Sequence, residues 1–272
     1  MGIVSVIRTE TSLHEPTYFF ICNLIINGIF GSFVFYPKLM IDLLAGYTTL
    51  SFEGCLIQAF CIQTYAYVDI FMFTAMAYDM YLAIGHPLRY TTLMTNRKAL
   101  TYIAASWCFV LVDQMVFVAW TSSLSLCGFT VKNVYCETMS LIKLSCGDAY
   151  LVNLVGSSVT LIIVMSSLLV VVYCYIRTSM ICLRISREAC QKAINALVTH
   201  LIAFTTYLAT TLFVIFFRYK ENGGATSRTA HLVLAMAGFA ITSTLNPFLY
   251  GLRTEALKIK LVKRKTRIFR TG

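Results

Sequence analysis

Six long apolar segments divide the chain, and polar or charged stretches separate them. A helix needs about 20 residues to cross the ~30 Å hydrocarbon core of a bilayer, and each segment reaches that length. The pattern therefore predicts an all-α membrane protein with a single transmembrane domain over residues 1–272. The expected spans are residues 18–44, 52–84, 99–124, 151–183, 194–217 and 229–250.

The two ends of the chain differ from these segments. Residues 1–7 (MGIVSVI) are apolar but much too short to span a bilayer. As written, the chain is thus expected to begin in the cytoplasm and to cross the membrane six times. Residues 252–272 are basic and weakly amphipathic, which predicts a cytoplasmic tail lying against membrane lipid.

Composition and charge narrow the class of protein. Of the 272 residues, 58% are hydrophobic and 12% are charged, whereas a soluble domain needs more polar groups to cover its surface. A formal net charge of +10 is also typical of nucleic-acid-binding proteins. Here the lysines and arginines cluster in loops and in the tail rather than on one amphipathic face, so we expect no nucleic-acid partner.

The distribution of lysine and arginine orients the spans. Cytoplasmic loops carry an excess of these residues, and the excess lies on the side that includes residues 76–90 and the tail. That side is therefore predicted to be cytoplasmic. The long loop over residues 124–148 is predicted to be extracellular.

Residues 76–90 read MAYDMYLAIGHPLRY, and they mark where one apolar span leaves the bilayer. An acid, Asp79, is followed by Pro87, which cannot continue a helix. The stretch resembles MAYDRYxAICxPLxY, the end of the third helix in odorant receptors, a branch of the rhodopsin-like G-protein-coupled receptors. Two positions depart from that form: Met80 stands where the family has Arg, and Gly85 where it usually has Cys.

The resemblance extends along the whole chain. LHEPTYFF, SFEGCLIQAF, KAINALVTHL and LNPFLYGLR are similar to family segments in the same order and spacing, and NGIFGSFVFYPK is closer to the fish-like type. The resemblance implies a seven-transmembrane receptor bundle with helix one largely missing. It also implies a plasma-membrane protein of olfactory neuron cilia. Such a receptor binds a small-molecule odorant from outside and activates a heterotrimeric G protein of the stimulatory, olfactory type.

Two alternatives to a signalling receptor remain at this point. Met80 and the missing first helix would both impair signalling, which leaves a pseudogene product or a binding-only decoy. A transporter is disfavoured, because no repeat relates the two halves of the chain. The sequence carries no phosphate loop, metal-spaced cluster or nucleophile triad in a suitable context, so we expect neither an enzyme nor a cofactor.

Four cysteines fall at or beyond the predicted outer face, where the oxidising environment favours pairing. They are Cys55, Cys127, Cys136 and Cys146, and four cysteines allow three connectivities. The resemblance implies Cys55–Cys136, which ties the outer loop to the third helix, and Cys127–Cys146 within the loop. Together the two bridges would hold a lid over an outer cavity.

The resemblance also implies an inner switch that couples to the G protein. In the family, the acid at Asp79 pairs with the neighbouring Arg at rest, and Met80 cannot form that lock. Read in isolation, Tyr250 is more typical of an interfacial anchor, but the surrounding NPxxY pattern favours the switch. The implied switch residues are Asp79, Met80, Tyr81, Tyr175, His200, Asn246, Pro247 and Tyr250.

Two further acids lie inside predicted spans, where ionisable residues are functional candidates. Asp69 matches a position at which the family often has an acid that helps hold sodium or water. The partner acid in helix two is missing, because Asn27 and Gly28 stand there, so only a weak sodium site is expected and no other metal. Asp113 is open to two roles: contact with the ligand, or a partner for a neighbouring helix.

The expected ligand cavity lies between helices three, five and six, above the switch. Bundles bind small molecules between helices, with a mostly apolar lining and a few polar groups. For each residue alone, helix packing is the alternative role. The implied ligand-binding residues are Ile62, Gln63, Ala66, Tyr67, Asp113, Val159, Thr160, Ile163, Thr211, Ile215 and Phe239.

Overall fold

The computed structural model describes residues 2–10, 14–45, 49–128, 131, 135–221, 236–244, 246 and 249, without the side chains of residues 2–3 and 213–221. Within these ranges the chain is helical, apart from one isolated β-bridge between Leu126 and Ser145. The helices are α1 (Gly2–Thr9), α2 (Pro16–Ala45), α3 (Phe52–Gly85), α4 (Tyr90–Leu93), α5 (Asn96–Ser122), α6 (Thr138–Ile142), α7 (Tyr150–Cys182) and α8 (Arg187–Glu221).

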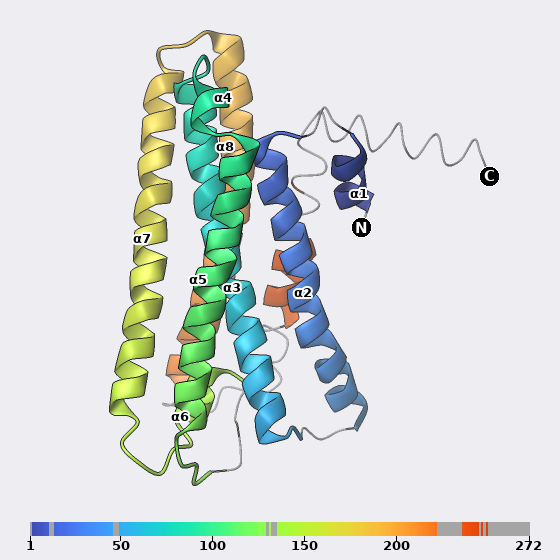
Figure 1. Cartoon of the computed structure of the whole chain (residues 1–272), viewed down its shortest axis with the longest axis vertical. Coiled ribbons are helices and arrows are strands. Elements are labelled where there is room, and N and C mark those ends of the chain that lie inside the picture. Colours follow the sequence, from blue (N-terminus) through green and yellow to red (C-terminus); the bar gives the residue numbers. More distant parts are fainter. Residues whose placement is uncertain are drawn as a thin grey trace, which may run out of the picture.

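The long helices α2, α3, α5, α7 and α8 run side by side as a bundle (Figure 1). Among the described residues, these five are long and apolar enough to cross a membrane. Helix α3 is the central one, because it contacts α2, α5, α7 and α8. Its most apolar window is 61% buried, against 22% for that of α7, whose outer face is left to lipid.

The helices follow the order of the predicted spans, and α2, α3, α5 and α7 have bounds close to the predicted ones. Helix α8 starts at Arg187, well before residue 194, because the polar stretch that precedes the apolar run is helical too. Ser186 caps this start by accepting a hydrogen bond from the backbone N–H of Ala189. Of the span 229–250, residues 236–244, 246 and 249 are described, and they are helical.

Local sequence signals set the ends of the other helices. The Ser51 hydroxyl accepts from the N–H of Gly54 at 3.0 Å and begins α3, and the Thr95 hydroxyl accepts from the N–H of Lys98 at 3.2 Å and begins α5. Such caps satisfy N–H groups that have no partner within the helix. At its other end α3 stops at His86, immediately before Pro87.

The core lies where α2, α5, α7 and α8 pack on the inner half of α3. Phe73 of α3 is fully buried, and its ring meets Phe204 and Tyr207 of α8 at centroid distances of 5.9 and 5.4 Å. Helix α1, which contains the apolar residues 3–7, lies beside the start of α2 (Figure 1) and buries Val6 and Ile7 against the core. The tail over residues 252–272 lies outside the described residues.

Candidate functional site

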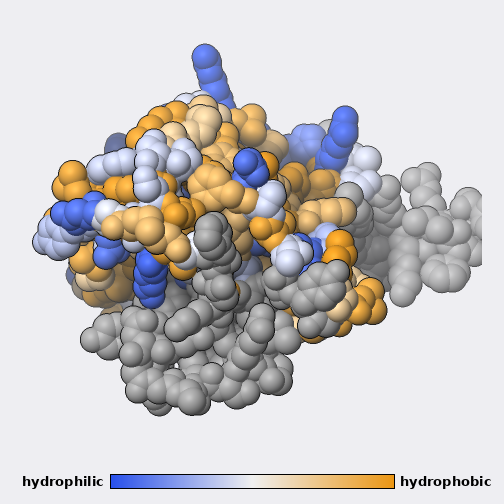
Figure 2. Space-filling view, turned by 90° about the horizontal axis from the view of Figure 1, so that it is seen from below, coloured by the Kyte–Doolittle hydropathy of each residue, from blue (hydrophilic) through white to orange (hydrophobic). Residues whose placement is uncertain are grey.

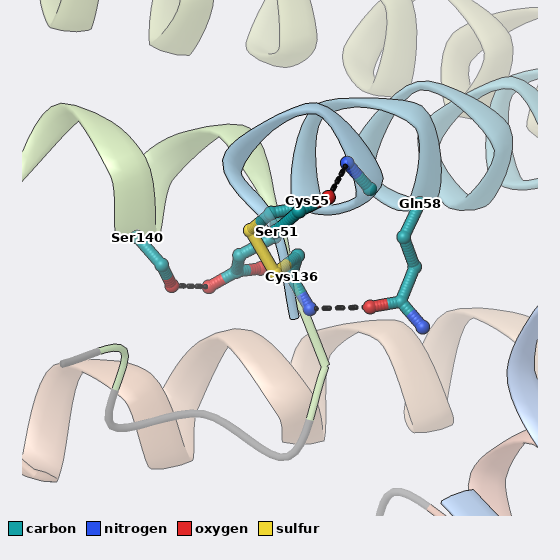
Figure 3. The surroundings of a disulfide bond; sticks show 7 residues. Ser51, Cys55, Gln58, Cys136 and Ser140 are labelled. Carbon is teal, nitrogen blue, oxygen red and sulfur yellow. Dashed lines mark hydrogen bonds between the residues drawn. A yellow bond between two sulfur atoms is a disulfide. The ribbon is translucent and has the colours of Figure 1, made fainter. Parts of the chain in front are cut away.

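Two disulfides organise the end of the bundle that carries α6. Cys55 at the start of α3 is bonded to Cys136, and Cys127 is bonded to Cys146. Gln58, one turn after Cys55 in α3, accepts a hydrogen bond from the backbone N–H of Cys136 at 2.9 Å (Figure 3). The segment that leads into α6 is therefore attached to α3 both covalently and by a buried hydrogen bond. Hydrophilic and hydrophobic side chains mix over this end of the molecule (Figure 2).

A cavity of about 710 Å³ lies inside the bundle next to α6, between α3, α5, α7, α8 and residues 238–242. Its lining is mostly apolar and aromatic, with a small number of polar groups, as in sites for small molecules. The structure places most of the ligand residues implied by the resemblance around this one cavity. Those that line it are Ile62, Gln63, Ala66, Tyr67, Asp113, Val159, Thr160, Thr211 and Phe239.

Two residues of the implied ligand set lie elsewhere. Ile163 is buried in the core cluster with Phe73 instead of lining the cavity. Val164, the next residue of α7, does line it, because successive residues of a helix point to different faces. The side chain of Ile215 is outside the described residues.

Tyr67 and Thr160 join α3 to α7 across the cavity. The Thr160 hydroxyl donates to the backbone oxygen of Gly156 at 2.8 Å, and this uses its single proton. The Tyr67 hydroxyl, 2.6 Å from the Thr160 oxygen, must therefore be the donor in that contact. Because these two hydroxyls already satisfy one another, the pair fixes the spacing of α3 and α7.

An aromatic stack forms the side of the cavity near α2. The ring of Phe239 is stacked on Phe35 of α2 and on Tyr65 of α3, with centroid distances of 4.2 and 5.6 Å. The Tyr65 hydroxyl donates to Thr242 at 3.0 Å. This arrangement ties residues 239–242 to α3.

Asp69 is buried in α3, with 1% of its surface exposed. Asn27 of α2 donates its amide to an Asp69 carboxylate oxygen and to the Tyr65 backbone oxygen, both at 2.8 Å. The amide thus occupies the place of the missing partner acid. Among the described residues, no group of three or more His, Cys, Asp or Glu side chains could hold a metal ion, so the weak sodium site stays a prediction.

At the opposite end of the bundle, the carboxylate of Asp79 is 1% exposed and accepts two hydrogen bonds. Thr17 at the start of α2 donates to one oxygen at 2.5 Å, and Tyr90 of α4 donates to the other at 2.8 Å. Burial and the adjacent Asp79 carboxylate both raise the pKa of Tyr90, which keeps its hydroxyl protonated. Two neutral hydroxyls therefore hold the carboxylate that Met80 cannot pair.

A second polar cluster lies nearer the middle of the bundle than Asp79 and joins α3, α7 and α8. The Nε2 atom of His200 is 3.0 Å from the backbone oxygen of Phe73, and Nδ1 contacts the Tyr175 hydroxyl. A carbonyl only accepts, so Nε2 carries the ring proton and Nδ1 accepts from Tyr175. Both ring nitrogens of this fully buried imidazole are satisfied in its neutral form.

The remaining switch residues are distributed around these two clusters. The Tyr81 ring packs against His86 and Tyr173, at centroid distances of 5.9 and 6.1 Å. Met80 is partly buried and Asn246 is buried. Pro247 and Tyr250 lie outside the described residues.

Comparison with known proteins places this geometry in a family. The family model described as olfactory receptor matches residues 1–267. The chain belongs to the olfactory receptor family. Human olfactory receptor 1J2 is 30% identical to this receptor over 263 residues, covering 96% of this chain and 83% of the relative. Gorilla olfactory receptor 1A1 is 34% identical over 264 residues, with the same two coverages of 96% and 83%.

A solved structure gives the same arrangement of helices. The crystal structure of squid rhodopsin superposes on this receptor with a TM-score of 0.71 at 16% identity, covering 98% of this chain and 80% of that one. The receptor therefore has the fold of a rhodopsin-like receptor in a multi-pass membrane protein. It responds to an odorant through a G protein and is not an enzyme, and neither the non-signalling form nor the transporter is favoured.

Sequence reasoning missed several residues that line the cavity of this receptor, among them Gln114, Phe117 and Tyr207. Gln114 follows Asp113 directly in an apolar span, so its polarity was a usable signal. Phe117 lies one turn after Asp113 on the same helix, and its ring covers Gly156 of α7 so closely that an added Cβ there would lie 1.9 Å from Cζ. Only the packing of α5 on α7 reveals that contact.

Proposed function

We propose that the odorant binds in the cavity between α3, α5, α7 and α8, and that α3 and α8 pass the effect of binding to the inner end. The observation that carries this proposal is the cavity itself, because most of the implied ligand residues meet there below a lid. An odorant shifts the equilibrium between resting and active arrangements only if it binds the active one more tightly. Tyr67 and Tyr207 are suited to sense it, since they line the cavity and bridge helices.

The path to the inner end runs through contacts between α3 and α8. Tyr207 lines the cavity and donates to the backbone oxygen of Ala66 at 2.6 Å. About two turns earlier in α8, nearer the inner end, His200 donates to the backbone oxygen of Phe73. A movement of α8 relative to α3 changes both hydrogen bonds together, and it opens the inner end where Asp79, Met80 and Tyr81 would contact the G protein.

Four finer features belong to the same proposal. The G protein is of the stimulatory, olfactory type, and the receptor acts in the cilia of olfactory neurons. Residues 1–272 form a single transmembrane domain, and residues 252–272 lie on the cytoplasmic leaflet, where basic side chains are attracted to anionic lipid. A peptide of residues 258–270 is expected to bind anionic vesicles far better than neutral ones and to detach at high salt.

Filling the cavity tests where the odorant binds. In cells that express a stimulatory G protein, the Ala66→Phe variant is expected to lose the cyclic-AMP response to the strongest odorant for the unmodified receptor. Ala105→Phe makes the same change on an exposed face of α5 and serves as the control. An unchanged response of Ala66→Phe at matched surface expression, or no response of the unmodified receptor to a broad odorant panel, would contradict the proposal.

A further inference from the structure

Gln114 lines the cavity, and among the described residues only one end of its side-chain amide forms a hydrogen bond. The residue lies on α5 and is 2% exposed, and its Nε2 atom donates to a carboxylate oxygen of Asp113 at 2.8 Å. This contact fixes the orientation of the amide, because the opposite orientation would set its oxygen against a carboxylate, where neither group can donate.

The other end of the amide has no partner. The Oε1 atom of Gln114 is buried without a hydrogen-bond donor within the described part of the chain, and the residue lines the cavity. Buried polar atoms in folded proteins are almost always hydrogen-bonded, and an exception calls for an explanation. A ligand that supplies the missing donor is such an explanation.

Asp113 adds a charge at the same place. Its carboxylate is half-buried, lines the cavity and receives the hydrogen bond from Gln114. The two ion pairs among the described residues, Lys38–Asp42 and Glu188–Lys192, do not involve it. Lys143, the basic residue of the lining, is exposed on the lid and forms neither pair. An anion attracts a cation more strongly in a low-dielectric cavity than in water.

Other polar side chains also line the cavity, among them Gln63, Glu137, Asn153 and Ser157. Phe117 and Val159 are apolar, and the hydroxyls of Tyr67 and Thr160 already satisfy each other. The wall near Asp113 thus presents two acceptors. A carboxylic acid would place a second anion beside Asp113, and an alcohol has one proton for the two acceptors. A primary ammonium has three donors and the opposite charge.

We propose that the odorant of this receptor is a small primary amine whose ammonium group is bound between Asp113 and Gln114 on α5. The inference rests on the proposed function, since it assumes that the odorant occupies this cavity. The apolar body of the amine lies against Phe117 and Val159. The volume of about 710 Å³ falls within the range of roughly 300–1,000 Å³ for sites that enclose small molecules.

Direct binding to the purified receptor in lipid nanodiscs tests this without a G protein. The probes are 2-phenylethylamine, 2-phenylethanol and phenylacetic acid, together with hexylamine, 1-hexanol and hexanoic acid. We expect at least one amine to bind about ten times more tightly than its matched alcohol and acid. In Asp113→Asn, which keeps the size of the side chain, that preference should disappear, and Gln114→Met should weaken it.

Asp148→Asn is the matched control. It removes an acid from the same side of the membrane, outside the cavity lining, and its Oδ1 acceptor for the N–H of Tyr150 is kept. The amine preference should therefore survive in this variant. Equal binding of amine, alcohol and acid, binding of none of them, or an unchanged preference in Asp113→Asn would overturn the inference. Amine binding without any cyclic-AMP response would count against the proposed function alone.

Discussion

Asp79 shows how single side chains compensate for a lost partner. Its carboxylate is buried, and it accepts one hydrogen bond from Thr17 and one from Tyr90. Removing a partner from a buried polar group costs about 1–3 kcal/mol, and more when the group is charged. These hydroxyls therefore stabilise the inner end of the bundle in the absence of an arginine at position 80.

We expect Thr17→Val and Tyr90→Phe each to lower the free energy of unfolding by about 1–3 kcal/mol, since each leaves one Asp79 oxygen without a donor. Thermal unfolding of the receptor in nanodiscs measures this. The control is Thr92→Val, because the Thr92 hydroxyl bonds only to the exposed backbone of Arg89. If both variants were as stable as that control, or equally destabilising in an Asp79→Asn background, the hydroxyls would not be partners of the carboxylate.

Met80 is the second residue with a direct test. Arginine at this position supplies donors and a charge that can reach the G protein, and it can also pair with Asp79 at rest. We expect the gain in coupling to outweigh the added resting lock. Met80→Arg should therefore increase odorant-evoked cyclic AMP at matched surface expression. Met80→Gln adds polarity without charge and should not, whereas equal responses from both variants would argue against a role for the charge.

The sequence identified most of these residues but few of their contacts. The motif at residues 76–90 singled out Asp79 and the absence of its arginine. It gave no hint of Thr17, which is 62 positions away in the chain, because a threonine near a helix start is common and only the packing of α2 on α3 brings it to the carboxylate. Likewise, Asp113 was predicted with two possible roles, and the free end of the neighbouring Gln114 amide appears only in the structure.

Among the elements, α2 and α3 are tightly packed at Gly31. A Cβ there would lie 2.7 Å from Cδ2 of Tyr65. The Tyr65 ring cannot easily move away, because its hydroxyl is bonded to Thr242 and its face is stacked on Phe239. Overpacking of this kind typically costs about 1–3 kcal/mol.

Gly31→Ala is therefore expected to lower the unfolding temperature of the receptor and to reduce its amount at the cell surface. Gly147→Ala provides the control, because a Cβ at that position meets no atom within 4 Å. Circular dichroism during heating of both purified variants measures the difference. Equal unfolding temperatures would show that the two helices adjust to the extra methyl group.

Helix positions could be predicted well from hydropathy, and helix ends less well. A bilayer demands an apolar run of set length, so every described long helix coincides with a predicted span. This requirement for apolar residues ends at the membrane surface. The polar first turns of α8 are helical because Ser186 caps them and not because they are apolar, which is why the prediction began too late there.

At the scale of the whole molecule, the Cys55–Cys136 disulfide attaches the outer loop to the bundle, and Cys127–Cys146 closes the loop on itself. Losing a disulfide costs 2–5 kcal/mol in small secreted domains, and less is expected in a bundle that lipid supports. Cys55→Ser should reduce surface labelling of the receptor on intact cells. Cys108→Ser, at a free and exposed cysteine of α5, should not.

Peptide mapping without reduction checks the pairing itself. It should recover Cys55 linked to Cys136 and Cys127 linked to Cys146. Alkylation of all four thiols before reduction would mean that the lid is held by packing alone.

The central position of α3 has a consequence for how such a receptor can change over evolution. Gln58, Tyr67, Phe73 and Asp79 all lie on this helix, and they serve the lid, the cavity and the inner end in turn. A mutation on α3 that altered odorant choice would therefore also disturb signalling. The cavity wall on α5 carries no such second role among these contacts, so new odorant preferences can arise there while the response they trigger stays the same.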